Sequence, residues 1–470
     1  MHQNKYRKTR IICTLGPATD SDEMLEKLIV AGADTFRLNM SHAMHEWVRD
    51  ICPRIRLISK RLDKNTGILF DLQGPSIRTG DVDGELELNV GDTVEFRKKD
   101  ADASVELSTT VNYEGLMGDV SVGDRLIVDN GNLLMQVKKT LEDRILCEAK
   151  TQGSMGSRRH INLPGVRLSL PALTSKDHQD LAVACECGVD FIAGSFVRDA
   201  DHVRELRAAM QEHGGDAHII AKIEDQEAVR NIDSIIAEAN LIMVARGDLG
   251  IEVNIEELPI IQRKIVKRCM EMGTRVIVAT HMLESMLTNP LPTRAEVTDV
   301  SNAVFEEADA VMLSGETSVG KYPAECVDIL NRIACRIERS GGLGYGKEAK
   351  LTTERQKTIR SAIQLADSIT GARIVVFTRR GNMPVQTALL RPHSSIHAFA
   401  PDDETCRKVK LARGVIARQI DFDGGPDLVL KRTIKKLLSE KVVEKGTPLV
   451  VISDMIQEGE VVDSVLLIHA

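Results

Sequence analysis

Two charged residues interrupt a buried-strand pattern in HIIAKIED, residues 218–225. The apolar residues of this stretch are typical of a buried strand, and Lys222 and Glu224 lie two residues apart, on one face of it. Charged side chains rarely lie inside such a strand unless they are paired or bind a ligand. Two interpretations follow, a structural salt bridge or a ligand site, and this stretch alone favours neither.

A further carboxylate, Asp248, follows the strand-like run LIMVARG at 241–247. Together with Glu224 it supplies hard oxygen ligands, and two carboxylates completed by substrate oxygens and waters suit Mg²⁺ or Mn²⁺. The nine cysteines are scattered and no His or Cys cluster accompanies the carboxylates, which disfavours zinc. The sequence therefore predicts a divalent-metal site, with a local turn contact between Arg246 and Asp248 as the alternative.

Cationic side chains end or follow strands of the same kind at Arg37, Arg78 and Lys222. Such a set suits a phosphate or carboxylate group, and the glycines of MVARGDLGIE let backbone amides approach an anion. Two chemistries fit these residues, phosphoryl transfer and metal-assisted stabilisation of an enolate. Schiff-base chemistry at Lys222 is disfavoured, because Glu224 beside it favours the charged amine.

These side chains can act together only if the fold brings the strand ends to one edge, and eight short apolar runs indicate strands that could do so. Most of the runs are separated by helical patterns, which indicates parallel strands. Eight such units are the count of a closed (β/α)₈ barrel, or TIM barrel, whose active site lies at the carboxyl ends of the strands. Polar residues recur at those ends, which favours the barrel over an open doubly wound sheet. The runs are TRIICTLG (9–16), TFRLNMS (35–41), ILFDLQ (68–73), DFIAGSF (190–196), HIIAKIE (218–224), LIMVARG (241–247), RVIVATH (275–281) and AVMLSG (310–315).

Two regions lie outside this pattern. The long gap between the third and fourth runs alternates apolar and polar residues and contains hairpin-like turns, typical of antiparallel β structure. We therefore predict a small β-barrel lid at residues 74–171, inserted into a catalytic barrel of residues 1–73 and 172–342. From the Gly-rich linker GGLGYGKEAK onward, residues 343–470 predict an open-sheet α/β domain, in which the strand-like runs ARIVVFTRRG, SIHAFAP, TPLVVISD and SVLLIHA alternate with helical stretches. In the barrel, MLESMLTN is interpreted as an amphipathic helix.

Composition narrows the classes of function. The 470 residues are 43% apolar and 28% charged, as in globular proteins. A formal net charge of −8 at pH 7 argues against a nucleic-acid partner, which requires a basic face. No apolar run reaches the roughly 18 residues that suggest a membrane span, and the basic N-terminus lacks signal-peptide features. A cytoplasmic protein with reduced thiols is the resulting expectation.

Ordered motifs over residues 9–335 resemble the pyruvate kinase family, in its bacterial-type, three-domain form. The resemblance implies the same fold, a homotetramer, and a phosphotransferase of glycolysis that moves the phosphoryl group of phosphoenolpyruvate to ADP, giving pyruvate and ATP. A Mg²⁺-dependent lyase of the phosphoenolpyruvate/pyruvate type and a non-catalytic phosphometabolite sensor are the rival interpretations. The motifs are TRIICTLGPAT, FRLNMSH, INLPGVRLSLPALTSKD, IIAKIED, IMVARGDLGIE, VIVATHMLESM and NPLPTRAEVTDVSNAVFEEADAVMLSGETSVGKYP.

The resemblance also implies roles for individual residues around phosphoenolpyruvate. Glu224 and Asp248 are expected to bind Mg²⁺ or Mn²⁺. Lys222 is expected to stabilise the transferred phosphoryl group and the enolate, and Arg37 to hold the phosphate. The residues implied at the carboxylate end are Ala245, Arg246 and Gly247 with Thr280, and a water relay near Thr280 and Ser314 is the hypothesis for protonation of the enolate.

A nucleotide site and a potassium site are implied at neighbouring positions. Ser76 stands where potassium-dependent members of the family carry Glu and potassium-independent members carry Lys, so the need for K⁺ stays open although its ligands favour a site. His281 replaces the usual Gln of the ATQMLESM motif and receives no catalytic role. The nucleotide-side residues are Arg78, His42, Asn39 and Arg158, with Arg159 beside the last, and the K⁺ ligands are Asn39, Ser41, Asp71 and the carbonyl of Leu72.

The predicted C-terminal domain departs from members of the family that fructose 1,6-bisphosphate activates. In FTRRGNMPVQTA, Thr378 is kept, but Arg380 and Met383 replace hydroxyl-bearing residues. The stretch ISDMIQEGEVVDSVLLIHA, interpreted as the C-terminal effector loop, carries Glu458, Glu460 and Asp463, which would repel a bisphosphate. We therefore expect a weak response or none to the bisphosphate. The alternatives for the loop Thr378, Arg379, Arg380, Gly381, Asn382 and Met383 are a sugar monophosphate or nucleotide effector site and a solvated surface.

Overall fold

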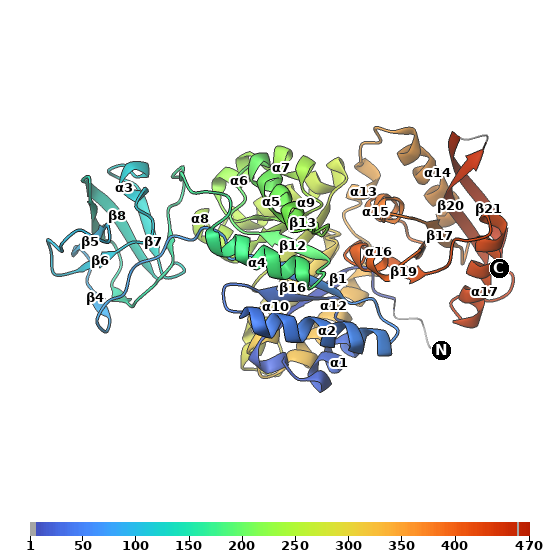
Figure 1. The fold of residues 1–470 in the computed structure, drawn as a ribbon, viewed down its shortest axis with the longest axis horizontal. Coiled ribbons are helices and arrows are strands. Elements are labelled where there is room, and N and C mark those ends of the chain that lie inside the picture. Colours follow the sequence, from blue (N-terminus) through green and yellow to red (C-terminus); the bar gives the residue numbers. More distant parts are fainter. Residues whose placement is uncertain (1–5, 458–459) are drawn as a thin grey trace.

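Three parts lie in a row along the long axis of the molecule (Figure 1). The computed structural model describes residues 6–457 and 460–470. The inserted β segment forms one end, the barrel lies in the middle, and the C-terminal α/β part forms the other end. Among the residues so described, no helix has both the length and the apolar character to cross a membrane.

The middle part is a closed barrel of eight parallel strands in the order β1-β16-β15-β14-β13-β12-β3-β2, which confirms the predicted (β/α)₈ fold. Aliphatic residues fill both faces of the strands because helices cover the outside of the sheet. Side chains such as Ile12, Ile220 and Ile277 pack inside the barrel. The strands are β1 (Arg10–Thr14), β2 (Thr35–Asn39), β3 (Gly67–Asp71), β12 (Phe191–Gly194), β13 (His218–Ile223), β14 (Leu241–Ala245), β15 (Arg275–Ala279) and β16 (Ala310–Leu313).

Helices follow the barrel strands, and two of them show how such a helix begins near the mouth. In α10, Thr293 Oγ1 accepts a hydrogen bond from the Glu296 N–H while the Glu296 carboxylate accepts from Thr293, a capping box. α8 instead begins directly at the end of β14, with Ala245 at its N-cap position. The helices are α1 (Asp22–Ala31), α2 (His45–Arg61), α4 (Ser175–Glu186), α5 (Ala200–Glu212), α6 (Gln226–Arg230), α7 (Ile232–Glu238), α8 (Arg246–Glu252), α9 (Leu258–Met272), α10 (Arg294–Phe305), α11 (Gly315–Ser318) and α12 (Pro323–Glu338), with a 3₁₀ turn at Pro17–Thr19.

The inserted part, called the lid below, contains a six-stranded sheet in the order β11-β7-β8-β9-β5-β6 and a two-stranded sheet of β4 and β10. Its edge strands β6 and β11 do not pair with each other, so the six-stranded sheet by itself does not close into the predicted small barrel. Residues 77–80 join these edges: Gly80 N–H donates to the Thr110 carbonyl at 2.7 Å, and Ile161 N–H to the Ile77 carbonyl at 2.9 Å. The elements are β4 (Leu86–Leu88), β5 (Thr93–Arg97), β6 (Ser108–Thr110), α3 (Leu116–Asp119), β7 (Arg125–Val128), β8 (Leu133–Thr140), β9 (Arg144–Ala149), β10 (Gly153–Met155) and β11 (Ile161–Asn162).

The C-terminal part is an open five-stranded sheet in the order β19-β18-β17-β20-β21, as predicted for an α/β domain. Two details correct the sequence analysis. The strand β19 was not identified. The predicted strands TPLVVISD and SVLLIHA are confirmed within β20 and β21, but these antiparallel strands extend into the stretch interpreted as the C-terminal effector loop. The elements are α13 (Tyr345–Glu348), α14 (Glu354–Ser368), β17 (Arg373–Phe377), α15 (Asn382–Leu389), β18 (Ile396–Ala400), α16 (Asp403–Lys408), β19 (Val415–Gln419), α17 (Pro426–Ser439), β20 (Pro448–Gln457) and β21 (Glu460–His469).

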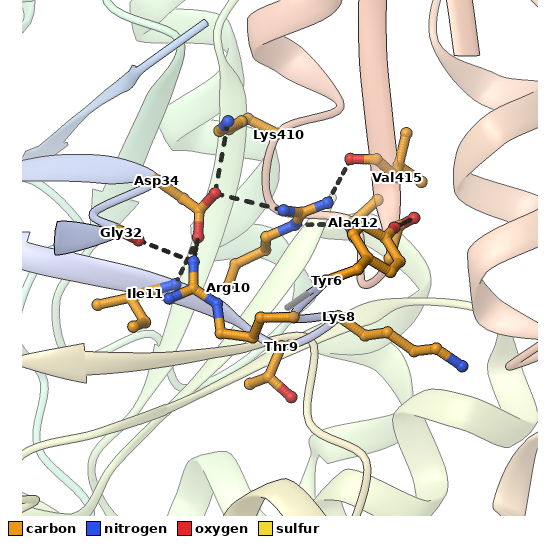
Figure 2. A network of polar contacts seen from close by, with 12 residues as sticks. Tyr6, Lys8, Thr9, Arg10, Ile11, Gly32, Asp34, Lys410, Ala412 and Val415 are labelled. Carbon is orange, nitrogen blue, oxygen red and sulfur yellow. Dashed lines mark hydrogen bonds and ion pairs between the residues drawn. The ribbon is translucent and has the colours of Figure 1, made fainter. Parts of the chain in front are cut away.

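Residues 407–415 of the C-terminal part dock on the amino-terminal end of the barrel, called the bottom below. Leu411 is fully buried and packs with the residues that fill the barrel interior. Beside it, Arg10 donates to the Ala412 and Val415 carbonyls and pairs with Asp34, which Lys410 also contacts (Figure 2). The C-terminal part is thus attached by both apolar and ionic contacts.

Two local predictions on the barrel surface are corrected. MLESMLTN does not form an amphipathic helix but a 3₁₀ turn at Glu284–Leu287, because the Glu296 carboxylate accepts from both the N–H and the hydroxyl of Ser285. The Gly-rich linker contains α13, whose Tyr345 packs against the apolar cluster outside the barrel. The linker is therefore partly ordered on the barrel.

Candidate functional site at the barrel mouth

A polar cavity of about 390 Å³ lies at the carboxyl ends of the barrel strands, where the lid meets the barrel. Residues predicted at four strand ends or their loops line it together with two lid arginines, which favours a ligand site over isolated structural contacts. The predicted residues in its wall are Arg37, Asn39, Ser41, His42, Leu72, Ser76, Arg78, Arg158, Arg159, Lys222, Glu224 and Asp248. The predicted residues that do not line it are Asp71, Ala245, Arg246, Gly247, Thr280, His281 and Ser314.

The Lys222 ammonium group, on β13, is surrounded by oxygen atoms. Its Nζ lies 2.8 Å from Glu224 Oε1 and 3.4 Å from Asp71 Oδ1, and it donates to Ser195 Oγ at 2.8 Å. Burial acts to lower the pKa of Lys222, but Asp71 and Glu224 outweigh burial and raise this pKa above its usual value. Lys222 therefore carries a positive charge, as an electrostatic role requires.

Glu224 is the first residue beyond β13 and is almost fully buried. Its Oε2 accepts a hydrogen bond from the Phe196 N–H at 2.6 Å. Burial raises the pKa of Glu224 to about 7 and Asp248 acts in the same direction, while Lys222 opposes them. Asp248 lies in the first turn of α8 and faces the same cavity. Two carboxylates held together at this cost have the chemistry of a divalent-cation site.

Arg37 on β2 and Asp71 at the end of β3 pair beneath the cavity. Arg37 Nε donates to Asp71 Oδ2 at 2.6 Å, and its Nη1 donates to Thr14 Oγ1 at 3.0 Å. Burial would raise the pKa of Asp71, but Lys222 and Arg37 hold it below its usual value. These contacts fix the direction of the Arg37 guanidinium, which lines the cavity.

The four predicted potassium ligands lie near one another at the ends of β2 and β3. Asn39 Oδ1 accepts from the Ser41 N–H at 3.2 Å, and the Leu72 carbonyl accepts from Ser195 Oγ at 2.7 Å. Their oxygens suit a monovalent cation, although Arg37 and Lys222 already offset the charge of Asp71. Ser76 Oγ accepts from Arg78 Nε at 3.3 Å, which places a cation of the protein at this position.

Arg246 and Thr280 organise the start of α8 rather than the cavity wall. Arg246 donates to the carbonyls of Ala279 and Thr280 and pairs with Asp299 at 2.7 Å. The Gly247 N–H donates to Thr280 Oγ1 at 2.8 Å. Arg246 and Asp248 thus form no local ion pair in the described chain, and the partner of Arg246 is Asp299 on α10.

Strained backbone conformations gather around the mouth. Thr280 has a φ of 69° and His281 a φ of 53°, in the left-handed region that a β-branched residue such as Thr rarely adopts. Phe196, Arg158 and Asn130 in the cavity wall also have positive φ values. Such strain persists only where the surrounding structure enforces it, and it concentrates at functional sites.

The lid contributes cavity residues that the sequence analysis missed. His160 and Phe196 lie across the cavity with ring centroids 5.8 Å apart, and Asp129 and Asn130 come from a lid turn. Burial lowers the pKa of His160, against the opposite effect of Asp248. The only sequence signal for His160 was its position directly after Arg158 and Arg159.

Two predicted residues near the mouth have other surroundings. The Ser314 hydroxyl is buried and has no hydrogen-bond partner among the described residues, while its N–H donates to Glu316 Oε2 at 2.7 Å. His281 is exposed, with Nε2 3.8 Å from the Glu284 carboxylate. Ser314 therefore has an unused hydroxyl, whereas His281 faces solvent.

The predicted effector loop runs from the end of β17 into α15 of the C-terminal part, and its last residue, Met383, is buried in that helix. Thr378 Oγ1 accepts from the Gly381 N–H at 2.8 Å, and Arg379 stacks 5.4 Å from the centre of the Phe422 ring. Asp463 pairs with Arg355 at 2.9 Å, so its charge is partly offset. Glu458 lies outside the described residues, and the structure describes no side-chain surroundings for Glu460.

Comparisons with known proteins agree over nearly the whole chain. Family models described as "Pyruvate kinase, barrel domain" and "Pyruvate kinase, alpha/beta domain" match residues 6–327 and 356–467. The chain is 37% identical over 450 residues to plastidial pyruvate kinase 2 of Arabidopsis thaliana, covering 95% of this chain and 78% of the relative.

A bacterial relative and a solved structure agree with these matches. Identity to a pyruvate kinase of Staphylococcus aureus (strain MRSA252) is 40% over 421 residues, covering 87% of this chain and 71% of that protein. A crystal structure of a pyruvate kinase from Cryptosporidium parvum superposes with a TM-score of 0.93 at 32% identity, covering 98% of this chain and 96% of that one.

Proposed function

The chain belongs to the pyruvate kinase family, and we propose that the cavity at its barrel mouth is where phosphoenolpyruvate gives its phosphoryl group to ADP. The activity itself, a phosphotransfer that yields pyruvate and ATP, follows from that membership. The observation that carries the assignment to this cavity is the grouping of Lys222, Glu224 and Asp248 in one wall. The roles below are proposed for the residues of this chain.

Glu224 and Asp248 would hold the divalent cation, Mg²⁺ or Mn²⁺. Their carboxylates share the cavity, and burial raises the pKa of Glu224 to about 7, so a bound cation would relieve an unfavourable charge. When bound, that cation would offset the negative charge of the substrate's carboxylate and phosphate groups.

Lys222 and Arg37 handle the transferred group. The charged Lys222 ammonium faces the cavity from the barrel floor and stabilises negative charge on the phosphoryl oxygens and on the enolate left behind. Arg37, held in place by Asp71 and Thr14, binds the phosphate. Both cations are positioned before substrate arrives, which lowers the reorganisation needed during transfer.

The carboxylate end of phosphoenolpyruvate binds at the start of α8. The backbone of Ala245, Arg246 and Gly247 supplies the amide groups of that first turn, and Thr280 supplies a hydroxyl. Thr280 is held in a strained conformation by its bonds to Gly247 and to the Ala279 carbonyl. Protonation of the enolate proceeds through a water near Thr280 and Ser314, and the unpaired Ser314 hydroxyl supports this relay.

ADP binds on the lid side of the cavity. Arg78 and Arg158 extend from the root of the lid, and His42 and Asn39 face them from the barrel. Arg78 Nη1 donates to the Arg158 carbonyl at 3.0 Å, so the two cations are part of one structural unit. This placement puts cationic donors opposite the metal-binding carboxylates, where the nucleotide phosphates would lie.

A monovalent cation binds beside this site through oxygens of Asn39, Ser41, Asp71 and Leu72. Because Asp71 already has two cationic neighbours, we expect K⁺ to stimulate the reaction without being strictly required. Activity measured in K⁺, in Na⁺ and in a bulky organic cation at equal ionic strength tests this expectation. Complete inactivity without K⁺ would contradict it.

Regulation is proposed at the loop between β17 and α15. Thr378, Arg379 and Arg380 offer a hydroxyl and two cations, which suits one phosphate of a sugar monophosphate or a nucleotide. Titration of activity with sugar monophosphates, nucleotides and fructose 1,6-bisphosphate tests the loop. Strong activation by the bisphosphate would overturn the expected preference. The homotetramer that the resemblance implies is proposed here as well, and its mass in solution decides it.

A coupled assay tests the function as a whole. Purified protein is expected to form ATP and pyruvate from phosphoenolpyruvate and ADP only when Mg²⁺ or Mn²⁺ is present. Absence of ATP formation together with Mg²⁺-dependent carbon–carbon bond cleavage of a 2-oxo acid to pyruvate would favour the lyase alternative. Binding of phosphoenolpyruvate with no turnover would favour the sensor alternative, which the complete set of Lys222, Glu224 and Asp248 argues against.

A further inference from the structure

One buried contact joins the root of the lid to the helix that carries Asp248. Asn162, in β11 of the lid, donates from Nδ2 to Glu252 Oε1, the last residue of α8, at 3.2 Å. Asn162 is 4% and Glu252 is 7% exposed. A carboxylate buried to this degree needs hydrogen-bond donors, and here the lid provides one.

Glu252 lies where three segments of the site meet. It stands one helical turn after Asp248 on α8. Its carbonyl accepts from Gln226 Nε2 at 2.5 Å, and Gln226 begins the helix that follows Glu224 and Asp225. Glu252 is therefore connected through backbone and side chain to both carboxylates proposed to bind the metal.

Asn162 is equally well connected on the lid side. It pairs with Ile127 of β7, and the preceding Ile161 bonds to the Ile77 carbonyl at the other strand of the lid root. His160 and Arg159, just before it, line the cavity. A shift of Asn162 would move these cavity residues with it, because they lie two and three residues before it in the chain.

We propose that Asn162 and Glu252 form a latch that fixes the root of the lid against α8 and thereby sets the distance between the lid cations and the carboxylates of the barrel. Neither residue lines the polar cavity at the barrel mouth, so both are positioning residues. The inference rests on the proposed assignment of Arg78 and Arg158 to the nucleotide and of Asp248 to the metal.

The groups around Glu252 make its hydrogen bond to Asn162 important for the buried carboxylate. Burial raises the pKa of Glu252 to about 7, Asn162 lowers it, and Asp225 and Asp248 raise it. Asn162 Oδ1 has no hydrogen-bond partner among the described residues. A protonated Glu252 would be able to donate to that oxygen, so carboxylic acid and amide would then satisfy each other.

A cavity of about 300 Å³ beside Glu252 leaves room for the lid root to move if the latch is broken. It lies between Arg125 of the lid and the barrel residues Val229, Arg230 and Ile261. An unfilled space on one side of a buried contact means that the neighbouring side chains do not by themselves hold the lid root in place.

Exchanging the two functional groups tests the latch. Asn162→Asp places two carboxylates against each other, and Glu252→Gln keeps an acceptor for Asn162. The double variant Asn162→Asp/Glu252→Gln restores the pair with donor and acceptor reversed, at constant size. Asn89→Asp, which adds the same charge at an exposed position of the lid, is the matched control.

We expect Asn162→Asp to raise KM for ADP by about tenfold, the scale of one lost hydrogen bond to a charged group. KM for phosphoenolpyruvate should hardly change, because that substrate is held by the barrel. Glu252→Gln should raise KM for ADP less than Asn162→Asp does, and the double variant should recover most of the loss. A merely structural role would lower the active fraction and leave both KM values unchanged.

Hydrogen exchange of residues 158–163 in the full-length variants separates this inference from the proposed function. Faster exchange there in Asn162→Asp, reversed in the double variant, supports the latch even if the protein forms no ATP. Wild-type exchange in Asn162→Asp overturns the latch, and so does a raised KM for ADP that Glu252→Gln fails to reverse. Absence of ATP formation by the wild type overturns the proposed function alone.

Discussion

The two ends of the barrel hold the same types of charged residue in opposite electrostatic states. At the bottom, Asp34 contacts Arg7, Arg10 and Lys410 and accepts from the Ile11 N–H (Figure 2). Despite burial, these contacts lower its pKa to about 2. At the mouth, burial raises the pKa of Glu224 to about 7, although Lys222 lies 2.8 Å away.

The bottom shows the same compensation at two other buried carboxylates, Asp309 and Asp190. Asp309 pairs with Arg391 at 2.9 Å and also accepts from the Val276 N–H. Asp190 pairs with Arg407 of the C-terminal part at 2.7 Å and with Arg56 at 2.8 Å. The carboxylates at the bottom are thus paired with arginines of the protein itself, and the pairs with Arg391 and Arg407 attach the C-terminal part to the barrel.

At the mouth the compensation of the carboxylates is less complete, because one lysine, Lys222, serves Glu224, Asp248 and Asp71. Lys222 contacts both Glu224 and Asp71, Arg37 also pairs with Asp71, and the lid arginines line the same cavity. An arrangement of this kind is unfavourable until a ligand completes it. Whether a buried carboxylate is fully paired with cations of the protein therefore distinguishes structural from functional carboxylates better than residue type or burial does.

The sharpest test of this comparison is Lys222→Met. Because Lys222 is proposed to stabilise the transferred group, kcat should fall by about a hundred- to a thousandfold, as when a preorganised electrostatic donor is removed. Asp71 keeps its bond to Arg37 and Glu224 keeps its bond to the Phe196 N–H, so the fold should survive. Steady-state kinetics and circular dichroism measure the two effects.

Lys264→Met, at an exposed position of α9, is the control for Lys222→Met and should retain wild-type kinetics. An active Lys222→Met protein would refute the catalytic role of Lys222. An unfolded one would place Lys222 with the structural charges of the bottom.

Arg391→Met tests the other end. Arg391 is 3% exposed and its partner Asp309 is fully buried, so the variant leaves a buried carboxylate without its guanidinium, at a cost of about 3 kcal/mol in unfolding free energy. The kcat of the folded protein should stay close to wild type, because the pair lies far from the mouth. Chemical denaturation followed by activity at low denaturant measures both quantities.

Arg332→Met is the matched control for Arg391→Met. Arg332 pairs with Asp328 on the exposed face of α12, with both side chains more than half exposed. Removing that pair should cost no more than about 1 kcal/mol. Equal losses in the two variants would mean that the bottom pair contributes nothing special to stability.

The sequence predicted the mouth far better than the bottom, and the reason is physical. Residues of the mouth follow eight local apolar runs, and the carboxyl ends of parallel strands meet at one rim, so local pattern places them. The bottom depends on pairs such as Arg10 with the Val415 carbonyl, about four hundred residues apart in the chain. No local pattern indicates that contact.

The remaining errors have similar causes. β19 reads VIARQ, with a burial pattern that is mostly intermediate at the edge of its sheet, so its composition carries little strand signal. The contact between Asn162 and Glu252 joins two domains across ninety residues. His160 lies just before β11 and is bridged to Arg78, about eighty residues earlier in the chain, so no local pattern places it in the cavity wall.

The dependence of stability on pH sharpens the comparison further. The pKa of Asp34 is lowered to about 2 in the folded protein, so the protein binds fewer protons there than the unfolded chain, whose Asp pKa is about 3.9. Its contribution of about 2 kcal/mol should be present above pH 4 and be lost as the pH falls toward 2. Thermal unfolding of wild type and Asp34→Asn between pH 6 and pH 2.5 measures it.

The stability gap between wild type and Asp34→Asn should be constant above about pH 4.5 and should narrow below that value. A control with Asp201→Asn, whose partner Arg204 lies beside it on the exposed surface of α5, should show no such narrowing. A gap that stays constant down to pH 2.5 would mean that Asp34 is not held ionised by its partners.

The smallest effect is expected at His281, which stands at the mouth without sharing its electrostatics. Its side chain and that of Glu284 are each 58% exposed, so solvent screens any charge they carry. His281→Gln should therefore change kcat/KM for phosphoenolpyruvate by less than about fivefold, the upper limit for an exposed pair.

Thr280→Val is the internal reference for His281→Gln, because Thr280 precedes His281 and both residues have a left-handed backbone conformation. That variant keeps the shape of Thr280 but loses the oxygen that accepts from the Gly247 N–H. A larger loss in His281→Gln than in Thr280→Val would show that charge at the exposed rim, rather than preorganised contacts inside it, governs catalysis.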